Sequence, residues 1–378
     1  MNRKNKNVNS KLQTTGNVLL KINRLLLGGV FVFSGFVKAI DPLGFTYKIE
    51  DYFQAFGGVF DKLAVLAFPA AICLSTLELL IGLSLIFKVH LKIASVLSVL
   101  FMLVMTPLTL YIALKNPVTD CGCFGDALII SNWATFYKNL VLITMAVLML
   151  VFNKRIHPLF VPKMQSVAVY IFVGVGVGLS VYCYRHLPLI DFRPYRVGVN
   201  IPNAMLRPDD APSDKYDVTF IYEKNGKQKE FTLDNYPKGD STWKFVDQKS
   251  VLVSKGYHAP IHDFSIVNDQ FDDITEKVIY NSGYTYLLVV YDLSKTSEEG
   301  AKEAEAIYQK ALKTGVSFYA LTSSSDDDIK NFKQKTGVTY PFCKTDPITL
   351  KTIIRANPGI MLIKNGTILG KWNWRDFN

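Results

Sequence analysis

Five long apolar segments in the first half of this 378-residue chain constrain its fold more than any other feature. A helix needs about 20 mostly apolar residues to cross the hydrocarbon core of a bilayer, and each segment is that long or nearly so. We therefore predict five membrane-spanning helices, with the lipid bilayer as their surroundings. They cover roughly residues 18–37, 63–87, 93–114, 132–152 and 166–184.

The first apolar segment follows a basic tail, residues 1–17, and could also be a cleaved signal peptide. It is long for a signal peptide. The sequence after it, Lys38-Ala39-Ile40-Asp41-Pro42, lacks a small-x-small cleavage site. We therefore expect this segment to be retained as a membrane helix.

Basic residues are unevenly distributed among the connections between these helices. The tail and the connections near residues 88–92 and 154–163 carry Lys and Arg without any acidic residue. The connections expected on the opposite side, to which we assign Lys38 and Lys138, also carry acidic residues. The positive-inside rule then predicts a cytoplasmic N-terminus and, after five crossings, a C-terminal half on the other side of the membrane.

The same distribution explains the formal net charge of +10, because residues 191–378 contain equal numbers of basic and acidic residues. Once topology accounts for the basic excess, there is no basic face left to explain. We expect no nucleic-acid partner.

The C-terminal half begins with a region, residues 191–259, that we interpret as a linker and a β-hairpin. Residues 191–213 are rich in proline and charge, which is typical of a linker. Asn225-Gly226 lies between two alternating segments, 216–222 and 229–233, and this pattern predicts a hairpin turn.

Residues 260–378 have the order of strands and helices expected for an α/β domain with helices on both faces of a sheet. Ser and Asp open one of the predicted helices and Gly closes it. The predicted strands cover residues 262–267, 284–291, 316–322, 359–364 and 367–372, and the helices cover 298–314, 325–337 and 346–356.

Four sequence features relate the first half to known families: Arg24, Phe33-Ser34-Gly35-Phe36-Val37-Lys38, Glu78-Leu79-Leu80-Ile81-Gly82 and Asp120-Cys121-Gly122-Cys123-Phe124-Gly125. Through them, residues 18–152 resemble the DoxX and MauE families of bacterial inner-membrane proteins. The resemblance implies a four-helix membrane domain in the inner membrane, followed by a loop and fifth helix at 153–190 and a periplasmic C-terminal half.

The last 119 residues resemble a thioredoxin-like domain of the peroxiredoxin or TlpA type, through Asp263-Phe264, the strand at 284–291 and Asn357-Pro358-Gly359. The resemblance implies a cis-proline at Pro358, an uncommon peptide geometry. The chain departs from the family at 292–297, where Asp-Leu-Ser-Lys-Thr-Ser replaces the Cys-x-x-Cys motif. Without thiols there, this domain cannot perform dithiol exchange by itself.

Cys121 and Cys123, one residue apart in the connection between the third and fourth apolar segments, are the candidate catalytic residues. Paired cysteines in an oxidising compartment usually form disulfides. A bridge across one residue is near the limits of comfortable geometry, which Gly122 eases, and strained, exposed disulfides are typically labile and oxidising.

Other interpretations of the five cysteines remain open. The Cys121–Cys123 bridge could be a structural staple, although so small a ring removes little chain entropy. We predict no metal site, because two thiolates are only half of a tetrahedral set. We expect Cys73 and Cys183 to be small buried packing residues, with Cys183 or Cys343 as a possible third redox participant.

Arg24 and Glu78 are ionisable residues inside the apolar segments. Such residues are costly in a membrane and are normally paired, so we predict that the two side chains are in contact. The pair either locks two helices together or lines a polar pocket for a quinone or a proton path. We therefore treat Arg24 and Glu78 as candidate cofactor-binding residues.

Two functions follow from these features. MauE-type proteins are associated with disulfide formation in exported partners, and some DoxX relatives with quinone-linked sulfur oxidation. The resemblance therefore implies a redox enzyme in which a periplasmic dithiol protein reduces Cys121–Cys123 and a quinone accepts the electrons. The alternative is a non-enzymatic membrane scaffold whose cysteine-free domain binds a periplasmic partner.

Overall fold

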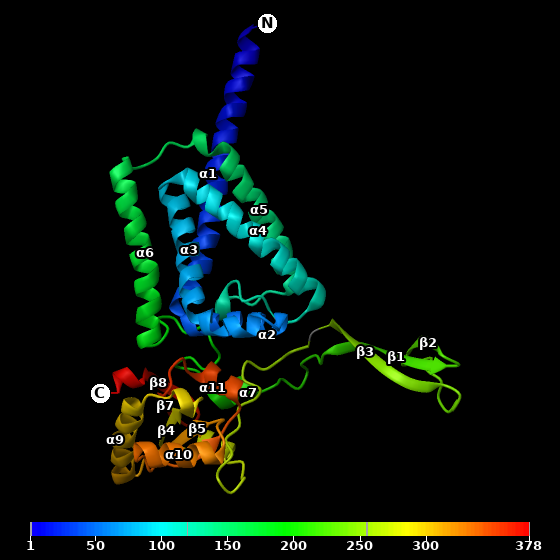
Figure 1. Ribbon diagram of the computed structural model, residues 1–378, viewed down its shortest axis with the longest axis vertical. Helices are drawn as coiled ribbons and strands as arrows, with labels where there is room; N and C mark the ends of the chain where they lie inside the picture. Colours follow the sequence, from blue (N-terminus) through cyan, green and yellow to red (C-terminus); the bar gives the residue numbers. More distant parts are fainter. Residues whose placement is uncertain (1, 119, 255, 378) are drawn as a thin grey trace.

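The computed structural model describes residues 2–118, 120–254 and 256–377. A helical bundle lies at one end of the molecule and an α/β domain at the other, while a three-stranded arm projects sideways (Figure 1). The N-terminus and the C-terminal domain lie at opposite ends of the bundle, as an odd number of crossings requires.

Five helices among the described residues are long and apolar enough to cross a membrane, and they confirm the five predicted segments. A 3-10 turn, Phe60–Leu66, directly precedes the helix that begins at Ala67. The spanning helices are α1 (Asn2–Ile40), α3 (Ala67–Phe87), α4 (Leu91–Lys115), α5 (Asn132–Phe152) and α6 (Pro162–Arg185).

Within the bundle, α1 packs mainly against α3, α4 packs against α5, and α6 packs on α3. The α1–α3 crossing is close because it contains Gly82. A Cβ atom at Gly82 would lie 2.6 Å from the backbone nitrogen of Val32, which shows that only glycine fits there. Small residues that let backbones approach are the usual means of packing membrane helices.

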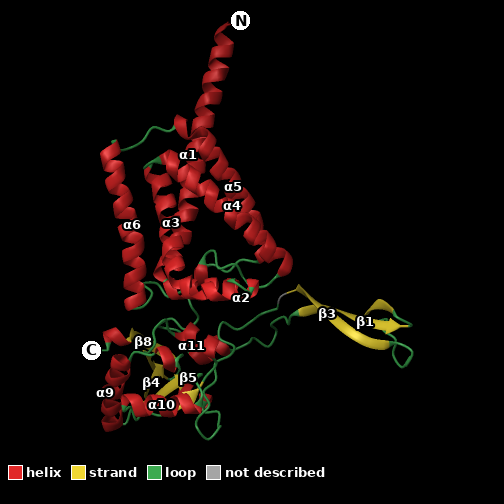
Figure 2. Ribbon diagram, viewed as in Figure 1, coloured by secondary structure: helices red, strands yellow, loops and turns green. Residues whose placement is uncertain are grey.

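A helix that the sequence analysis did not predict, α2 (Pro42–Phe56), lies across the end of the bundle between it and the C-terminal domain (Figure 2). Asp41 caps its N-terminus, where Oδ1 accepts a hydrogen bond of 2.9 Å from Gly44 N. Proline at the first helical position suits this start. The buried Ile49 packs with Ala67 and Ala71 of α3, which holds α2 against the bundle.

The C-terminal domain contains a five-stranded sheet in the order β6-β5-β4-β7-β8. Strands β4, β5 and β6 are parallel, and β7 and β8 run antiparallel to their neighbours. The strands are β4 (Tyr284–Val289), β5 (Ser317–Thr322), β6 (Phe342–Lys344), β7 (Gly359–Lys364) and β8 (Thr367–Asn373).

Both faces of this sheet are buried, which is expected of parallel strands. Leu287 and Val289 face a core that includes α11 (Pro347–Ile353), and Leu288 faces a second core formed with α9 (Glu298–Thr314). Helix α10 (Asp326–Thr336) covers the same face as α9, and α8 (Thr275–Ile279) covers the same face as α11.

The Asn357–Pro358 peptide is cis, as predicted. The fold is therefore the expected α/β thioredoxin-like domain.

The strand predicted at 262–267 is wrong. Val267 forms only isolated bridges with Asp273 and Lys344. The backbone nitrogen of Ile266 instead donates to Thr275 Oγ1 at 2.8 Å, so this segment turns back toward α8. This segment is therefore a loop, in which the Thr275 side chain accepts a hydrogen bond that a strand partner would otherwise accept.

Residues 191–206 pack along the edge of this sheet. Gly198 N donates to Ile368 O, and Ile201 N donates to Gly366 O, both at 2.8 Å. Ile201, at the start of α7 (Ile201–Met205), is buried in the sheet's core. A segment that the sequence analysis interpreted as a linker thus contributes to the C-terminal domain.

The projecting arm is a three-stranded antiparallel sheet in the order β2-β1-β3 (Figure 1). The predicted hairpin is present, with β1 (Lys215–Lys224) and β2 (Lys227–Thr232) joined at Asn225 and Gly226, both of positive φ. The third strand, β3 (Lys244–Ser254), was not predicted. Its residues mix charged and apolar side chains without strict alternation.

Candidate functional site at the Cys121–Cys123 disulfide

Cys121 and Cys123 form a disulfide in the connection between α4 and α5, with their Cα atoms 5.5 Å apart. Each residue is only 7% exposed. Gly122 between them has a φ of +63°, and a Cβ there would lie 3.1 Å from Lys48 Cγ in α2. Glycine is therefore needed both for the backbone conformation and for the close approach of α2.

Helix α2 holds the disulfide loop from the side of the C-terminal domain. Lys48 Nζ donates to Asp120 Oδ2 at 2.9 Å, while Asp120 Oδ1 accepts from Gly122 N at 2.9 Å. The Tyr52 hydroxyl donates to Cys121 O at 2.5 Å. Burial raises the pKa of Tyr52, which keeps this hydroxyl a neutral donor.

On the bundle side, the disulfide loop is joined to a buried ion pair. Ser34 Oγ donates to Cys123 O at 2.8 Å and accepts from Lys38 Nζ at 3.1 Å. Lys38 Nζ also donates to both carboxylate oxygens of Glu78, at 2.6 and 2.9 Å. The Lys38 and Glu78 side chains are each 3% exposed, so their charges are compensated almost entirely by each other.

The predicted contact between Arg24 and Glu78 is wrong. Arg24 Nη1 instead donates to the carbonyls of Leu85 and Ile86 at the end of α3, both at 2.5 Å. Helical side chains lean toward the N-terminus of their own helix, and α1 and α3 are antiparallel, so Arg24 and Glu78 lean apart. For the same reason Lys38 and Glu78 lean toward each other.

Lys38 was assigned to a connection because the first apolar segment was expected to end at residue 37. The structure continues α1 to Ile40, so Lys38 lies inside the bundle. Lys138 was likewise assigned to a connection and lies in the second turn of α5. The sequence does hold one signal for Lys38, since Ser34 and Lys38 are four residues apart and share a helix face.

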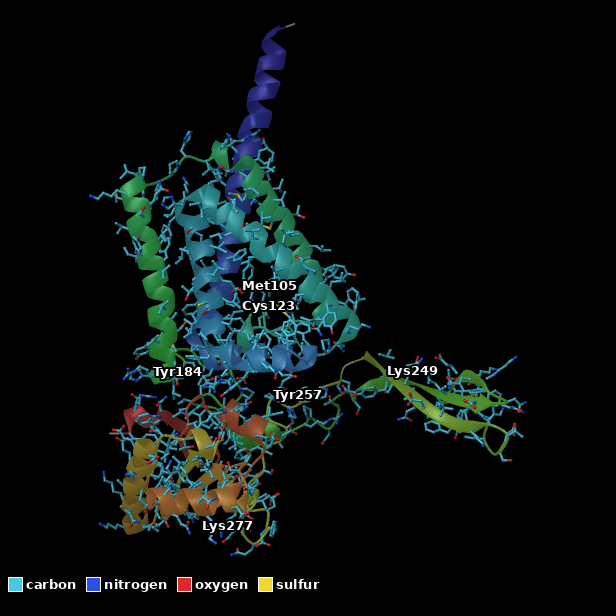
Figure 3. All side chains as sticks on the ribbon, viewed as in Figure 1. Met105, Cys123, Tyr184, Lys249, Tyr257 and Lys277 are labelled. Atoms are coloured by element: carbon cyan, nitrogen blue, oxygen red, sulfur yellow. A yellow bond between two sulfur atoms is a disulfide. The ribbon has the colours of Figure 1, made fainter. Side chains whose placement is uncertain are left out.

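A small intramembrane cavity of about 30 Å³ adjoins Cys123. Figure 3 shows Met105 and Cys123, two of its lining residues, inside the bundle. The ionisable residues on its walls are Lys38, Glu78 and Lys138. Lys138 Nζ lies 4.2 Å from the centre of the Phe124 ring, next to Cys123. A cavity of this size holds one or two water molecules.

A larger interdomain cavity of about 430 Å³ lies on the other side of the disulfide loop, between α2 and the C-terminal domain. Gly122 and Lys48 line it, together with Asp126 and Arg355. The Cys121–Cys123 loop therefore separates an interdomain cavity from an intramembrane one.

Arg355 attaches the C-terminal domain to the membrane domain. Its Nε donates to both carboxylate oxygens of Asp41 at 3.0 Å, and its Nη2 donates to Asp126 Oδ2 at 3.4 Å. Arg355 is 8% exposed and lies two residues before Asn357, which precedes the cis-proline. Burial raises the pKa of Asp126, while the charge of Arg355 opposes this increase. The cis-proline end of the thioredoxin-like domain thus faces α2 and the disulfide loop.

The segment that replaces Cys-x-x-Cys begins at Asp292. Asp292 Oδ1 accepts from the backbone nitrogen and hydroxyl of Ser294, at 3.0 and 2.6 Å, and Asn357 Nδ2 donates to Asp292 O at 2.7 Å. This segment borders a second interdomain cavity, of about 700 Å³, which Tyr184 at the end of α6 also lines (Figure 3). Hydroxyls and carboxylates therefore occupy the place of the thiols.

The remaining cysteines are separate from this site. Cys343 is 3% exposed in the core of the C-terminal domain, and burial raises its pKa to about 11. Cys183 is 1% exposed in α6, as expected of a packing residue. The expectation for Cys73 is wrong, because its side chain is exposed on the surface of α3. Among the described cysteines, only Cys121 and Cys123 form a disulfide.

Residues 16–152 match the family described as methylamine utilisation protein MauE. The membrane domain is therefore similar to this family. Residues 216–255, in the projecting arm, match a family described as a domain of unknown function, DUF8463. No curated protein matches the chain. The match and the five long apolar helices indicate a multi-pass membrane protein, and the disulfide in its MauE-like part indicates a function related to thiols and disulfides.

Two solved structures are similar to the C-terminal part. One is the solution structure of a putative protein disulfide isomerase from Bacteroides thetaiotaomicron, with 16% identity, a TM-score of 0.25, and coverage of 30% of this chain and 76% of the other. The second is a thiol:disulfide interchange protein of the thioredoxin family from Chlorobium tepidum TLS. It has 13% identity, a TM-score of 0.22, and coverage of 29% of this chain and 81% of the other.

Proposed function

We propose that this protein is a membrane-bound thiol–disulfide oxidoreductase whose redox centre is the Cys121–Cys123 disulfide. The observation that carries the proposal is the position of the disulfide loop between two cavities. Gly122 borders the interdomain cavity, and Cys123 borders the intramembrane cavity that contains Lys38 and Glu78. A dithiol protein outside the bilayer and a lipid-soluble acceptor inside it could therefore be served by one pair of sulfurs.

The first half-reaction oxidises a periplasmic dithiol protein. A thiolate of that partner attacks Cys121 Sγ, the Cys121–Cys123 bond breaks, and Cys123 leaves as a thiolate. The partner's second thiolate then attacks its own sulfur in the mixed disulfide and releases Cys121. The partner leaves with a disulfide, and two electrons remain on Cys121 and Cys123.

The second half-reaction restores the disulfide. Cys121 and Cys123 give two electrons to a quinone, which takes up two protons and becomes a quinol. Glu78 and Lys38 are ionisable groups beside Cys123 and are placed to serve proton movement there. The cavity of about 30 Å³ must widen to admit a quinone ring. Arg24 does not line this cavity, so we assign it to the end of α3 and not to the acceptor.

In this proposal the N-terminus is cytoplasmic and the C-terminal domain is periplasmic. That domain has no thiols at residues 292–297, so its role is to bind the partner and to cover the disulfide. Arg355 holds it against Asp41 and Asp126, next to the loop that carries Cys121 and Cys123. Both cysteines are nearly buried, so a partner reaches Cys121 only after this cover shifts.

A trapping experiment in cells tests the proposal. In Cys123→Ser the free Cys121 thiolate attacks the disulfide of the oxidised partner, the partner's S–S bond breaks, and no Cys123 thiol is left to displace the partner from Cys121. A covalent adduct with the partner should therefore accumulate and disappear on reduction. Cys121→Ser is the matched control and should trap much less. Neither variant should support disulfide formation in the partner.

The same contacts of Arg355 favour a second function, that of a scaffold in which the disulfide only shapes the loop that the C-terminal domain grips. The two functions differ in the trapping experiment. A scaffold gives no adduct through Cys121, and Cys123→Ser cells keep the parental phenotype. That pair of results would overturn the redox proposal.

A further inference from the structure

The intramembrane cavity beside Cys123 carries an unbalanced positive charge. Lys38 and Glu78 neutralise each other at 2.6 Å, whereas no ion pair in the described part of the chain involves Lys138. Lys138 interacts electrostatically with both Lys38 and Glu78. With all three groups in their usual ionised forms, the cavity walls have a net charge of +1.

The surroundings of Cys121 lack this excess positive charge. Its neighbour is Asp120, whose carboxylate is paired with Lys48 of α2, and it shares with Cys123 an apolar cluster that also contains Ile112. No cationic side chain lines the intramembrane cavity from α4, which contributes Phe101, Met102 and Met105. The charged groups facing Cys123 are thus Lys38 of α1, Glu78 of α3 and Lys138 of α5, while the Lys48–Asp120 pair is on the α2 side.

We infer that Lys138 stabilises a thiolate at Cys123, so that the reduced pair carries its negative charge on the sulfur that faces the membrane interior. A cation beside a cysteine favours the thiolate, and the attraction between the two charges is stronger at low dielectric. This inference rests on the proposed function and deepens it, because it fixes the order of bond breaking. Cys121 is the sulfur that the partner attacks, and Cys123 is the leaving group, since the sulfur with the lower pKa leaves faster.

A stabilised thiolate also sets the redox poise of the disulfide. Whatever stabilises the reduced form makes the disulfide a stronger oxidant. The Lys138 ammonium thus favours the half-reaction in which the partner's dithiol is oxidised. Lys138 acts through Cys123 and needs no contact with the partner or the acceptor.

The test is the pH profile of alkylation of single thiols in the purified full-length protein in lipid nanodiscs. Cys121→Ser leaves Cys123 as the site's thiol, and iodoacetamide labelling is followed by mass spectrometry of its peptide. Adding Lys138→Gln should move the profile to higher pH and slow labelling at neutral pH by about tenfold, the equivalent of about one pKa unit. Lys138→Arg should keep the parental profile. Lys62→Gln, which removes an exposed cation of the 3-10 turn before α3, should change nothing.

Comparing the titration of the two thiols gives a second measurement, and a purely structural role of Lys138 would not change its result. Cys123 in the Cys121→Ser protein should titrate at lower pH than Cys121 in the Cys123→Ser protein. In the protein with both cysteines, Lys138→Gln should shift the equilibrium with glutathione about tenfold toward the disulfide, or about 30 mV. A Lys138→Gln profile that overlies the parental one, or a Cys121 that is the more acidic thiol, would overturn the inference. Failure of trapping in cells would instead overturn the proposed function.

Discussion

The membrane domain and the C-terminal domain divide between them the parts that a thioredoxin-like protein normally holds together. The C-terminal domain keeps the sheet and the cis-proline at Pro358 but has Asp292 and Ser294 where thiols would be. The membrane domain has the thiols, Cys121 and Cys123, in a short loop. The cis-proline end of one domain lies against the thiol loop of the other, and Arg355 joins them. The domain without thiols thus lies against the loop that carries them.

The largest effect is expected from removing the thiols of the membrane domain, which should abolish redox activity. Cys121→Ser and Cys123→Ser should each abolish oxidation of a dithiol substrate by purified protein supplied with a quinone. Cys343→Ser, which removes a buried thiol of the C-terminal domain, should leave the rate within about twofold of the parent, because its raised pKa keeps it unreactive. Activity that survives in Cys121→Ser but not in Cys343→Ser would reverse the assignment.

The next largest effect concerns the joint between the domains. Arg355→Leu leaves Asp41 and Asp126 without their cation, and breaking a buried ion pair costs about 3 to 5 kcal/mol. The C-terminal domain should then separate from α2, and a water-soluble phosphine should reduce Cys121–Cys123 faster. Arg196→Leu, at an exposed position of the same domain's edge segment, is the control. Equal reduction rates in the parent and Arg355→Leu would show that the domain does not cover the disulfide.

Within the membrane domain, the ion pair predicts a specific coupling. Glu78→Gln should destabilise the bundle by about 3 kcal/mol because it leaves Lys38 buried without a counter-charge. A double-mutant cycle by thermal unfolding in detergent should give about 1 to 3 kcal/mol between positions 38 and 78. The cycle between positions 24 and 78 should give none. A coupling between Arg24 and Glu78 would contradict the observed pairing.

A smaller effect is expected at the glycine between the cysteines. Gly122→Ala places a Cβ at positive φ and 3.1 Å from Lys48 Cγ, and should cost about 1 to 2 kcal/mol. Gly125→Ala also has positive φ but meets open space, so it measures the backbone cost alone. Thermal unfolding of both variants separates the contact with α2 from the backbone strain. Equal losses would mean that α2 does not press on the loop.

The smallest effect is a pH dependence of the C-terminal domain. Burial, with the charge of Arg193, lowers the pKa of Lys371 from 10.5 to about 7, despite its ion pair with Asp191. The folded domain then binds fewer protons than the unfolded chain above pH 7, so stability should rise with pH between about 7 and 10. Lys371→Met should flatten this rise in the melting temperature followed by tryptophan fluorescence. A parental melting temperature that falls over this range would contradict the prediction.

The sequence predicted those parts of the fold that depend on neighbouring residues. Five apolar segments were long enough to identify helices, and Ser325 with Gly337 bounds the helix expected at 325–337. Asn225-Gly226 identified its turn. Each of these features depends only on residues close together in the sequence, so it can be predicted from one sequence.

The site was predicted less completely because its contacts join distant segments. Cys121 and Cys123 were recognised from their spacing, but Lys38, Lys138 and Arg355 were not. Lys38 meets Glu78 only because α1 and α3 are antiparallel and their side chains lean toward each other. Arg355 meets Asp41 only after the whole C-terminal domain has docked. Neither contact can be predicted from the spacing of these residues along the sequence.

The redox state of Cys121 and Cys123 in living cells tests the central claim most directly. Acid quenching followed by alkylation with a mass-tagged maleimide would report how much of the pair is reduced. The account predicts a mostly oxidised pair that becomes reduced when quinone synthesis is blocked and reoxidises when quinone is restored. A pair that stays fully oxidised throughout would contradict it and leave the disulfide as a structural link.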